Sequence, residues 1–134
     1  MPVISNTDET PLIRTDFSDE VAWTQLVDAV KNPSDDGFLA NLHIISDREF
    51  EEIAADALAC SAVDTSHAIL FVADKSTMTH VERPILCVDV LAPERTFRVI
   101  PSELWGPENN LSLANMDFAE FADNAGSDGI FRGF

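Results

Sequence analysis

The stretch that most constrains the fold is the run of six apolar residues at 68–73, AILFVA. Its apolar residues do not alternate with polar ones, which is typical of a central strand that is covered on both faces. Strand-like stretches also occur at 11–15 and 42–45, and a helical pattern follows each of them. Because strands that alternate with amphipathic helices form parallel crossovers, these three strands are expected to lie parallel in one sheet.

Both helical patterns begin at polar residues that can cap a helix. Asp16 or Ser18 is expected to cap the first helix. The tetrapeptide SDRE at 46–49 has the form of a capping box for the second, because Ser46 can accept from the N3 amide while Glu49 bonds back. The expected buried faces are Trp23, Leu26, Val27 and Val30 in the first helix, and Phe50, Ile53, Ala54, Ala57 and Leu58 in the second.

Two further strand patterns occur at 85–91 and 96–100, and the four residues between them, APER, form turns readily. These strands are therefore expected to pair as an antiparallel hairpin. If the loop has four residues, Asp89 lies opposite Arg98 and the two charges form an ion pair on one face of the sheet. The alternative interpretation makes Asp89 a catalytic acid and Arg98 its substrate anchor, although structural pairs are the commoner cause of such a pattern.

The order of elements predicts an α/β fold. We expect a three-layer sandwich with a mixed sheet of about five strands, in which the first three are parallel, the C-terminal hairpin is antiparallel and helices cover both faces. The length of 134 residues suits one domain. Residues 1–10 are polar and are expected to form a flexible tail, and residues 11–134 a single compact domain.

The segment at 97–121 combines large apolar residues with amides and is expected to form a lid over the domain. Trp105 follows a strand directly and is flanked by prolines, which predicts that it is largely buried and holds this segment to the rest of the chain. Pro107 suits the first position of a short helix. Asp117 and Glu120 predict a capping box at the start of another helix.

Asn109, Asn110 and Asn115 are the most unusual polar feature of this segment. Their amides could orient a ligand, because each amide both donates and accepts hydrogen bonds. They could equally cap helix ends and tie down the lid, and this structural use is the favoured one. As candidate ligand-binding residues they are grouped with Arg14 and Trp105.

Each of the first three strands is followed closely by an acid: Asp16, Asp47 and Asp74. In open α/β sheets ligands bind beyond the carboxyl ends of the strands, and three carboxylates there could hold Mg²⁺. Arg14 or Lys75 could pair with an anionic substrate. Helix capping explains Asp16 and Asp47 without a metal, so no metal site is expected, and Asp16 and Asp74 remain candidate catalytic residues.

The histidines, His43, His67 and His80, are far apart and lack zinc-type spacing, so each is best explained as a structural residue. His43 is the catalytic candidate among them, and pairing of a histidine with a cysteine in space stays open. Cys60 and Cys87 fall in apolar stretches and are expected to be buried free thiols. No Gly-rich phosphate loop is present, so no cofactor is expected.

The chain carries 8 Lys and Arg against 24 Asp and Glu, a formal net charge of −16. Such a surface repels nucleic acid and anionic membranes and favours solubility. It is best explained as a solvated acidic surface, and it could also suit a basic protein partner. The sequence has neither a signal-peptide pattern nor a stretch of roughly 18 uninterrupted apolar residues. We therefore expect a cytoplasmic protein that binds neither nucleic acid nor membrane, with thiols kept reduced.

The sequence LWGPENNLSLANMDF at 104–118 resembles a motif of a family of small acidic bacterial domains of unknown function. The resemblance covers nearly the whole chain after residue 10, and this motif is its specific part. It implies a single compact domain, and it brings no activity, cofactor or catalytic residue. The other similar features are LIRTDF at 12–17, FLAN at 38–41, LFVAD at 70–74, FRVIP at 97–101 and FRGF at 131–134.

Two hypotheses of function follow. The first is a non-enzymatic interaction or regulatory module that binds a basic partner, because the charge is large and no catalytic constellation is recognisable. The second is a cofactor-free enzyme acting on a small molecule, as an isomerase, cyclase or hydrolase, with a pocket under the segment at 105–118. A pocket lined by Asn109 or Asn115 would favour the enzyme, and a closed core beneath Trp105 would exclude it.

Overall fold

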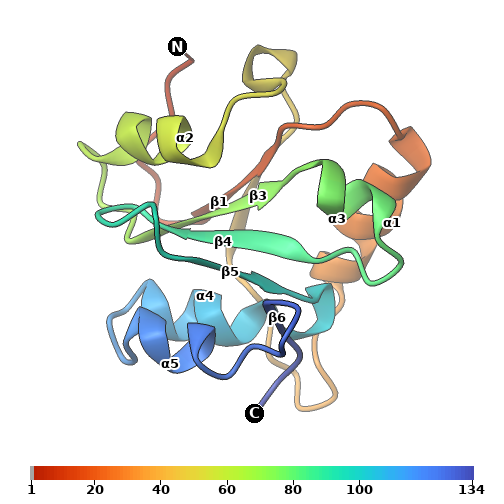
Figure 1. Cartoon of the computed structure of the whole chain (residues 1–134), viewed down its shortest axis with the longest axis vertical. Coiled ribbons are helices and arrows are strands. Elements are labelled where there is room, and N and C mark those ends of the chain that lie inside the picture. Colours follow the sequence, from red (N-terminus) through yellow and green to blue (C-terminus); the bar gives the residue numbers. More distant parts are fainter. Residues whose placement is uncertain (1) are drawn as a thin grey trace.

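The computed structural model describes residues 2–134 and has one mixed sheet between two layers of helices (Figure 1). Its strands lie in the order β2 (Leu42–Ile45), β1 (Thr10–Arg14), β3 (Ile69–Ala73), β4 (Ile85–Asp89), β5 (Thr96–Val99) and β6 (Ile130–Phe131). β1 pairs in parallel with β2 and β3, β4 pairs antiparallel with β3 and β5, and β6 runs parallel to β5. The predicted α/β sandwich is confirmed, with six strands where about five were expected, because the C-terminal residues add β6 at the edge.

Helices cover both faces of this sheet (Figure 1). One face is covered by the 3₁₀ helix η1 (Arg48–Phe50) and by α2 (Ala55–Ala62). The other is covered by α1 (Glu20–Lys31), α3 (Lys75–Thr79), η2 (Pro101–Glu103), α4 (Trp105–Leu111) and α5 (Phe118–Ala122). Among residues 2–134, every helix is too short or too polar to span a bilayer.

The central strands β1 and β3 are buried along their whole length, as the apolar run at 68–73 predicts. Successive side chains of a strand point to opposite faces, so these two strands divide the core into two clusters. Leu12 and Phe71 pack against the layer that contains α1. Ile13 and Val72 pack against the layer that contains α2.

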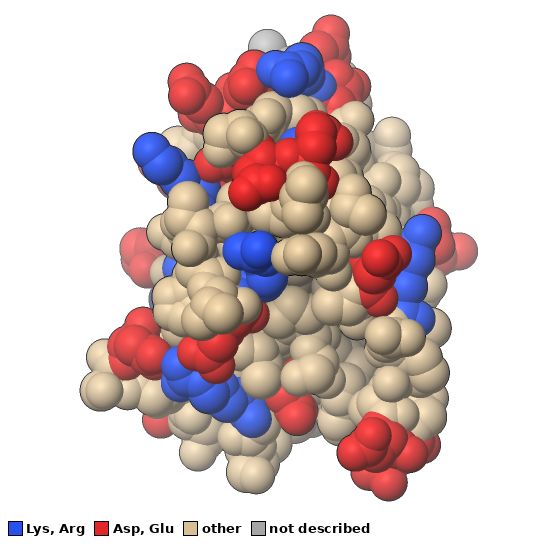
Figure 2. Space-filling view, turned by 90° about the vertical axis from the view of Figure 1, so that its right-hand side faces the viewer, with Lys and Arg blue, Asp and Glu red and all other residues tan. Residues whose placement is uncertain are grey.

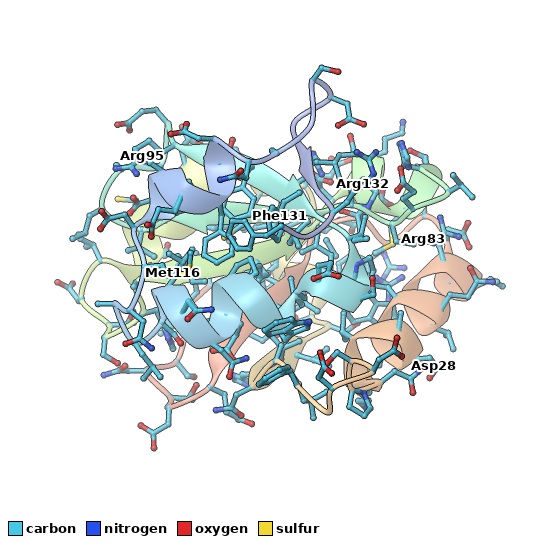
Figure 3. All side chains as sticks on the ribbon, turned by 90° about the horizontal axis from the view of Figure 1, so that it is seen from below. Asp28, Arg83, Arg95, Met116, Phe131 and Arg132 are labelled. Carbon is cyan, nitrogen blue, oxygen red and sulfur yellow. The ribbon has the colours of Figure 1, made fainter. Side chains whose placement is uncertain are left out.

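An aromatic cluster holds α5 and β6 to the sheet. The ring of Phe97 on β5 lies 5.0 Å from that of Phe118 and 6.1 Å from that of Phe121, measured between centroids. Phe131 lies 5.2 Å from Phe121 in an edge-to-face arrangement, and Figure 3 shows Phe131 projecting between α4 and α5. Such pairs contribute about 0.5–1.5 kcal/mol each beyond the area that they bury, so the C-terminal residues belong to the core.

The residues before β1, expected to form a flexible tail, lie against the α2 layer where the structure describes them. Ile4 is 3% exposed and packs in the cluster that contains Phe50 and Leu58. Asn6 Oδ1 accepts hydrogen bonds from the amide and the hydroxyl of Ser66, at 3.0 and 2.8 Å. These contacts connect the start of the chain to the loop that follows α2.

The first helix begins later than the sequence predicts. Its cap is Asp19, whose carboxylate accepts from the Ala22 amide at 3.0 Å. Asp16 instead accepts from the amide and hydroxyl of Ser18, at 2.7 and 2.6 Å, in the turn before the helix. The prediction that Asp16 or Ser18 caps this helix is therefore wrong, because the two residues bond to each other.

The second predicted helix is interrupted. Asp47 caps η1 by accepting from the Glu49 amide at 2.9 Å, so the predicted cap at Ser46 is wrong. The Ser46 hydroxyl instead accepts from Nη1 of Arg14 at 3.3 Å. Glu52 adopts a φ of 60°, a left-handed conformation that ends the helical turn, and α2 starts only beyond it.

The hairpin of β4 and β5 forms, but its register differs from the prediction. Arg98 lies opposite Leu86, whereas the prediction placed it opposite Asp89. The loop is longer than four residues, because the Asp89 amide donates to the Arg95 carbonyl at 3.3 Å. The Val90 amide has already left the hairpin and donates to the backbone carbonyl of the residue before β3. Asp89 and Arg98 therefore point to opposite faces of the sheet, and the predicted ion pair is wrong.

Trp105 is only partly exposed, in line with the prediction that it is largely buried, but it belongs to neither core cluster. Its ring stacks on that of Phe38 with centroids 4.6 Å apart and 15° between the planes, and Phe38 is itself 48% exposed. Trp105 therefore fastens the loop before β2 to α4 and does not fill the core. Pro107 occupies the third position of α4, not the first. The capping box of Asp117 and Glu120 is confirmed.

The two cysteines differ in their surroundings. Cys87 on β4 is buried as expected, whereas Cys60 on α2 is exposed. Burial raises the pKa of the Cys87 thiol well above its usual value, and the nearby charge of Asp89 adds to this shift. Cys87 is therefore a neutral core residue and not a reactive nucleophile.

Candidate functional site

A cleft of about 430 Å³ opens at the carboxyl ends of β1 and β3. The chain leaves β1 through α1 on one face of the sheet and reaches β3 through α2 on the other, so the two crossovers diverge between these adjacent strands. In open α/β sheets such a point of divergence is where ligands bind. The cleft is lined by residues 15–18, residues 51–55, Val72, Asp74, Lys75 and Leu86.

The inner wall of the cleft is apolar. Val72 on β3 and Leu86 on β4 are direct cross-strand partners on the face of the sheet that α2 covers. Val72 is 2% exposed, and Leu86 is half-buried. Ile53, which precedes α2, and Ala55, its first residue, are half-buried and continue this wall. The interruption at Glu52 delays the start of α2, which leaves this end of the sheet accessible.

Two backbone hydrogen bonds hold one side of the cleft. The Thr15 amide donates to the Ala73 carbonyl at 3.0 Å, which continues the pairing of β1 with β3 beyond the strand ends. The Thr15 carbonyl accepts from the Glu52 amide at 2.9 Å. Asp16 and Glu52 therefore lie on the same side of the cleft, next to the end of β1.

Asp74 caps α3 at the edge of the cleft and is bound by Arg98. Nη1 and Nη2 of Arg98 donate to its two carboxylate oxygens at 2.9 and 2.8 Å, and the Thr77 amide donates at 3.2 Å. Burial raises the pKa of Asp74, but the hydrogen bonds and charge of Arg98, together with Thr77, hold this pKa below its ordinary value. Asp74 is therefore ionised with both oxygens occupied, a poor arrangement for proton transfer or metal binding.

Three charged side chains of the cleft have no ion-pair partner among residues 2–134: Asp16, Glu52 and Lys75. Asp16 accepts from Ser18 through Oδ1, which leaves its Oδ2 available. Glu52 is exposed. The available charge of the cleft is thus two carboxylates against one ammonium, a surplus of negative charge.

Asp47 and Arg14 lie outside this cleft. Arg14 is 2% exposed and points to the α1 face, where it donates to Glu20 at 2.6 Å and to the Asp16 carbonyl at 3.0 Å. Its guanidinium also lies 4.3 Å from the ring centroid of Phe17. The three acids considered for Mg²⁺ are therefore not brought together, and residues 2–134 hold no group of three His, Cys, Asp or Glu side chains suited to a metal.

Asp89 and His43 also lie away from the cleft. Asp89 Oδ2 is 3.8 Å from Nη1 of Arg95, and both residues line a separate hollow of about 480 Å³ beside Phe118. His43 lies on β2, at the edge of the sheet. Its Nδ1 is buried and has no hydrogen-bond partner in the part of the chain that the structure describes. The catalytic candidates from the sequence are thus spread over separate places.

The asparagines of the lid bond mainly to backbone. Nδ2 of Asn109 donates to the Trp105 carbonyl at 2.7 Å, and Nδ2 of Asn110 donates to the backbone carbonyl one turn earlier in α4 at 2.8 Å. Asn115 is exposed beyond the end of this helix. Asn109 and Asn110 already bond to backbone carbonyls through Nδ2, which is the geometry of structural amides.

A third cavity, of about 410 Å³, has Trp105 in its lining. Asn110 is the lid asparagine that lines it among the residues described. The charged residues that line it are Glu103 and Arg132. Arg132 already donates two hydrogen bonds of 2.8 Å to Glu82. This cavity therefore offers aromatic walls and few free polar groups.

Glu108 is a buried polar residue that the sequence analysis did not single out. It is 4% exposed, and its carboxylate accepts from the Thr10 hydroxyl at 2.9 Å, the Asn41 amide at 2.6 Å and the Ser112 hydroxyl at 3.1 Å. It joins α4 to the amino ends of β1 and β2, away from the cleft. The signal in the sequence was an acid in the amide-rich segment at 97–121, four residues before a serine.

The fold and its site define a small mixed α/β domain with a negatively charged cleft where its crossovers diverge. The chain belongs to a family of domains of unknown function, DUF6924, whose model matches residues 9–134. The relationship to a family of unknown function, inferred from the motif at 104–118, is thereby confirmed. No curated protein matches the chain. Function must therefore be argued from the charges and cavities themselves.

Proposed function

We propose that this domain is a non-enzymatic interaction module of the cytoplasm, which binds a basic partner protein and thereby restrains or adapts that partner. The observation that carries the proposal is the distribution of charge. The arginine side chains are engaged in contacts within the molecule, whereas most acids face solvent without a basic partner. The free thiols of Cys60 and Cys87 suit the reducing compartment that we propose.

The arginines are occupied by contacts inside the chain. Five of them form ion pairs with carboxylates, and the sixth, Arg83, donates to two backbone carbonyls and to Gln25. Six of the 24 acids take part in ion pairs within residues 2–134. On the face that carries α1 and α3, Figure 2 shows acidic side chains in several groups, with basic side chains lying close to acidic ones.

This distribution gives the molecule a negative outer field, which a partner of opposite charge would sense at a distance. Complementary fields raise association rates and exclude partners of like charge. An interaction of this kind needs no catalytic group, which agrees with the occupied state of Asp74 and Arg98.

Affinity capture with the full chain as bait tests the proposal. We expect basic proteins to be retained at about 0.1 M salt and released near 1 M, because the screening length falls from about 10 Å to about 3 Å. A bait carrying Asp28→Asn, Asp36→Asn and Glu94→Gln, three exposed acids outside ion pairs, should recover less of the same proteins. Capture of nothing at low salt, or of proteins without basic character, would refute the proposal.

The second candidate is a cofactor-free enzyme acting on a small molecule in the cavity that has Trp105 in its lining. The observation that favours it is the cavity itself, whose volume of about 410 Å³ would admit a small ligand. A screen of small polar molecules by nuclear magnetic resonance distinguishes the two candidates. A compound that shifts the amides of Asn110 and Arg132 and is chemically converted would favour the enzyme over the interaction module.

A further inference from the structure

The cleft at the carboxyl ends of β1 and β3 combines an apolar wall with an acidic side. The wall consists of Val72, Leu86 and Ile53, which belong to or lie against the sheet. Asp16 and Glu52 lie next to the end of β1. Its volume of about 430 Å³ falls in the range of about 300–1,000 Å³ that is usual for binding pockets.

The charges of the cleft are divided between occupied and available groups. Asp74 is bound by Arg98, and Glu51 lies 3.3 Å from Arg48. The carboxylates of Asp16 and Glu52 remain available on the β1 side. The single ammonium, that of Lys75, follows β3 on the other side. A cation would therefore be attracted to the β1 side and repelled from the β3 side.

We infer that this cleft receives one lysine or arginine side chain of the partner protein. These side chains carry an aliphatic stem and a cationic tip, so the stem would lie on Val72 and Leu86 while the tip reaches Asp16 and Glu52. The inference rests on the proposed function and names the contact through which it operates. The cleft would thus select a protruding basic residue rather than a diffuse basic surface.

Other occupants fit the same lining less well. An anionic group would meet the surplus of carboxylates, which Lys75 balances only in part. A purely apolar side chain would cover Asp16 without giving its carboxylate a partner, and such burial of unpaired charge is costly. A basic side chain covers the apolar wall with its aliphatic stem and pairs its charge with the carboxylates.

Titration of the isotope-labelled full chain with three capped amino acids provides the first test. The probes are the Nα-acetyl N-methylamides of lysine, arginine and norleucine, the last having an apolar stem without a cation. We expect the lysine and arginine probes to shift the amides of residues 15–18 and 52–55, and norleucine to bind at least about tenfold more weakly. Equal binding of norleucine, or shifts spread over all acidic segments, would overturn the inference.

Paired variants with equal change in charge provide the second test. Asp16→Asn with Glu52→Gln should weaken lysine-probe binding at least about tenfold, whereas Asp35→Asn with Asp36→Asn, in an exposed loop, should change it less than about twofold. Ala54→Leu, which narrows the cleft without altering its charge, should also weaken binding. The amide spectrum of each variant reports whether it is folded.

The outcomes separate this inference from the proposed function. If both charge variants weaken the probe equally, the cleft is not the site, whereas a general attraction to basic partners stands. If butane-1,4-diamine binds the cleft more tightly than the lysine probe, the occupant is a free amine and the partner side chain is excluded. If the basic proteins recovered by capture bind the cleft variants and the loop variants alike, the inference fails although the proposed function survives.

Discussion

Arg98 on β5 donates two hydrogen bonds to Asp74, at 2.9 and 2.8 Å, and so connects the hairpin to the cap of α3. The side chains of Arg98 and Asp74 are 23% and 28% exposed, respectively. The guanidinium also donates to the Pro84 carbonyl at 3.2 Å. A single side chain therefore holds the end of the cleft, the start of α3 and the approach to β4.

Arg98→Ala should lower the free energy of unfolding by about 2 kcal/mol, because it leaves a partly covered carboxylate without its main donor. Denaturation by urea measures this change. Arg95→Ala is the control: Arg95 is 47% exposed and lies 3.8 Å from Asp89, so its loss should cost less than about 1 kcal/mol. Equal losses in the two variants would mean that Arg98 and Asp74 form an ordinary surface pair.

The same pair gives the domain a dependence on pH. The folded pKa of Asp74 lies below its ordinary value of 3.8, so its contribution to stability is present above that value and is lost as the pH falls through the folded pKa. We expect the wild type to lose more stability than Asp74→Asn between about pH 7 and about pH 3. Unfolding curves over this range measure the difference, and parallel pH profiles would show that Asp74 does not contribute.

The hairpin illustrates what the sequence could and could not predict. The strands at 85–91 and 96–100 were evident from their apolar residues, and so was their antiparallel pairing. Their register was predicted wrongly, because the prediction assumed that Asp89 and Arg98 form an ion pair with each other. Arg98 instead bonds to Asp74, which lies 24 residues away in sequence, and no local pattern identifies that partner.

The candidate site shows the same division. Asp16 and Asp74 were correctly located at neighbouring strand ends, since parallel strands bring their carboxyl ends to one edge. The role of Glu52 was missed because its position depends on a left-handed backbone and a bond to Thr15, and a glutamate gives no local sign of either. Leu86 joins the wall only through pairing with Val72 across the sheet.

Glu108→Gln should destabilise the fold by about 2 kcal/mol, because the carboxylate accepts from Thr10, Asn41 and Ser112 and an amide nitrogen would face donors. The control is Glu94→Gln, a change of the same chemistry at an exposed position, which should cost less than about 0.5 kcal/mol. Thermal and urea unfolding compare the two. Equal stability of the two variants would show that Glu108 does not contribute to the attachment of α4.

A double-mutant cycle measures how much the contact between Trp105 and Phe38 contributes to the free energy of unfolding. We expect Trp105→Ala to cost about 1–3 kcal/mol, less than a fully buried tryptophan, because the ring is half-buried. The coupling energy with Phe38→Ala should be about 0.5–1.5 kcal/mol, the usual range for aromatic pairs. Additive effects of the two substitutions would show that the stacking contributes nothing of its own.

The most direct test of the proposed function is the affinity of a captured partner, measured by titration calorimetry over a range of salt concentrations. If the domain acts through its negative surface, the dissociation constant should rise steeply between about 0.1 M and about 1 M salt, where charge screening becomes strong. The partner should also bind through a basic surface. A partner bound with the same affinity at both salt concentrations would contradict the proposal that charge governs this interaction.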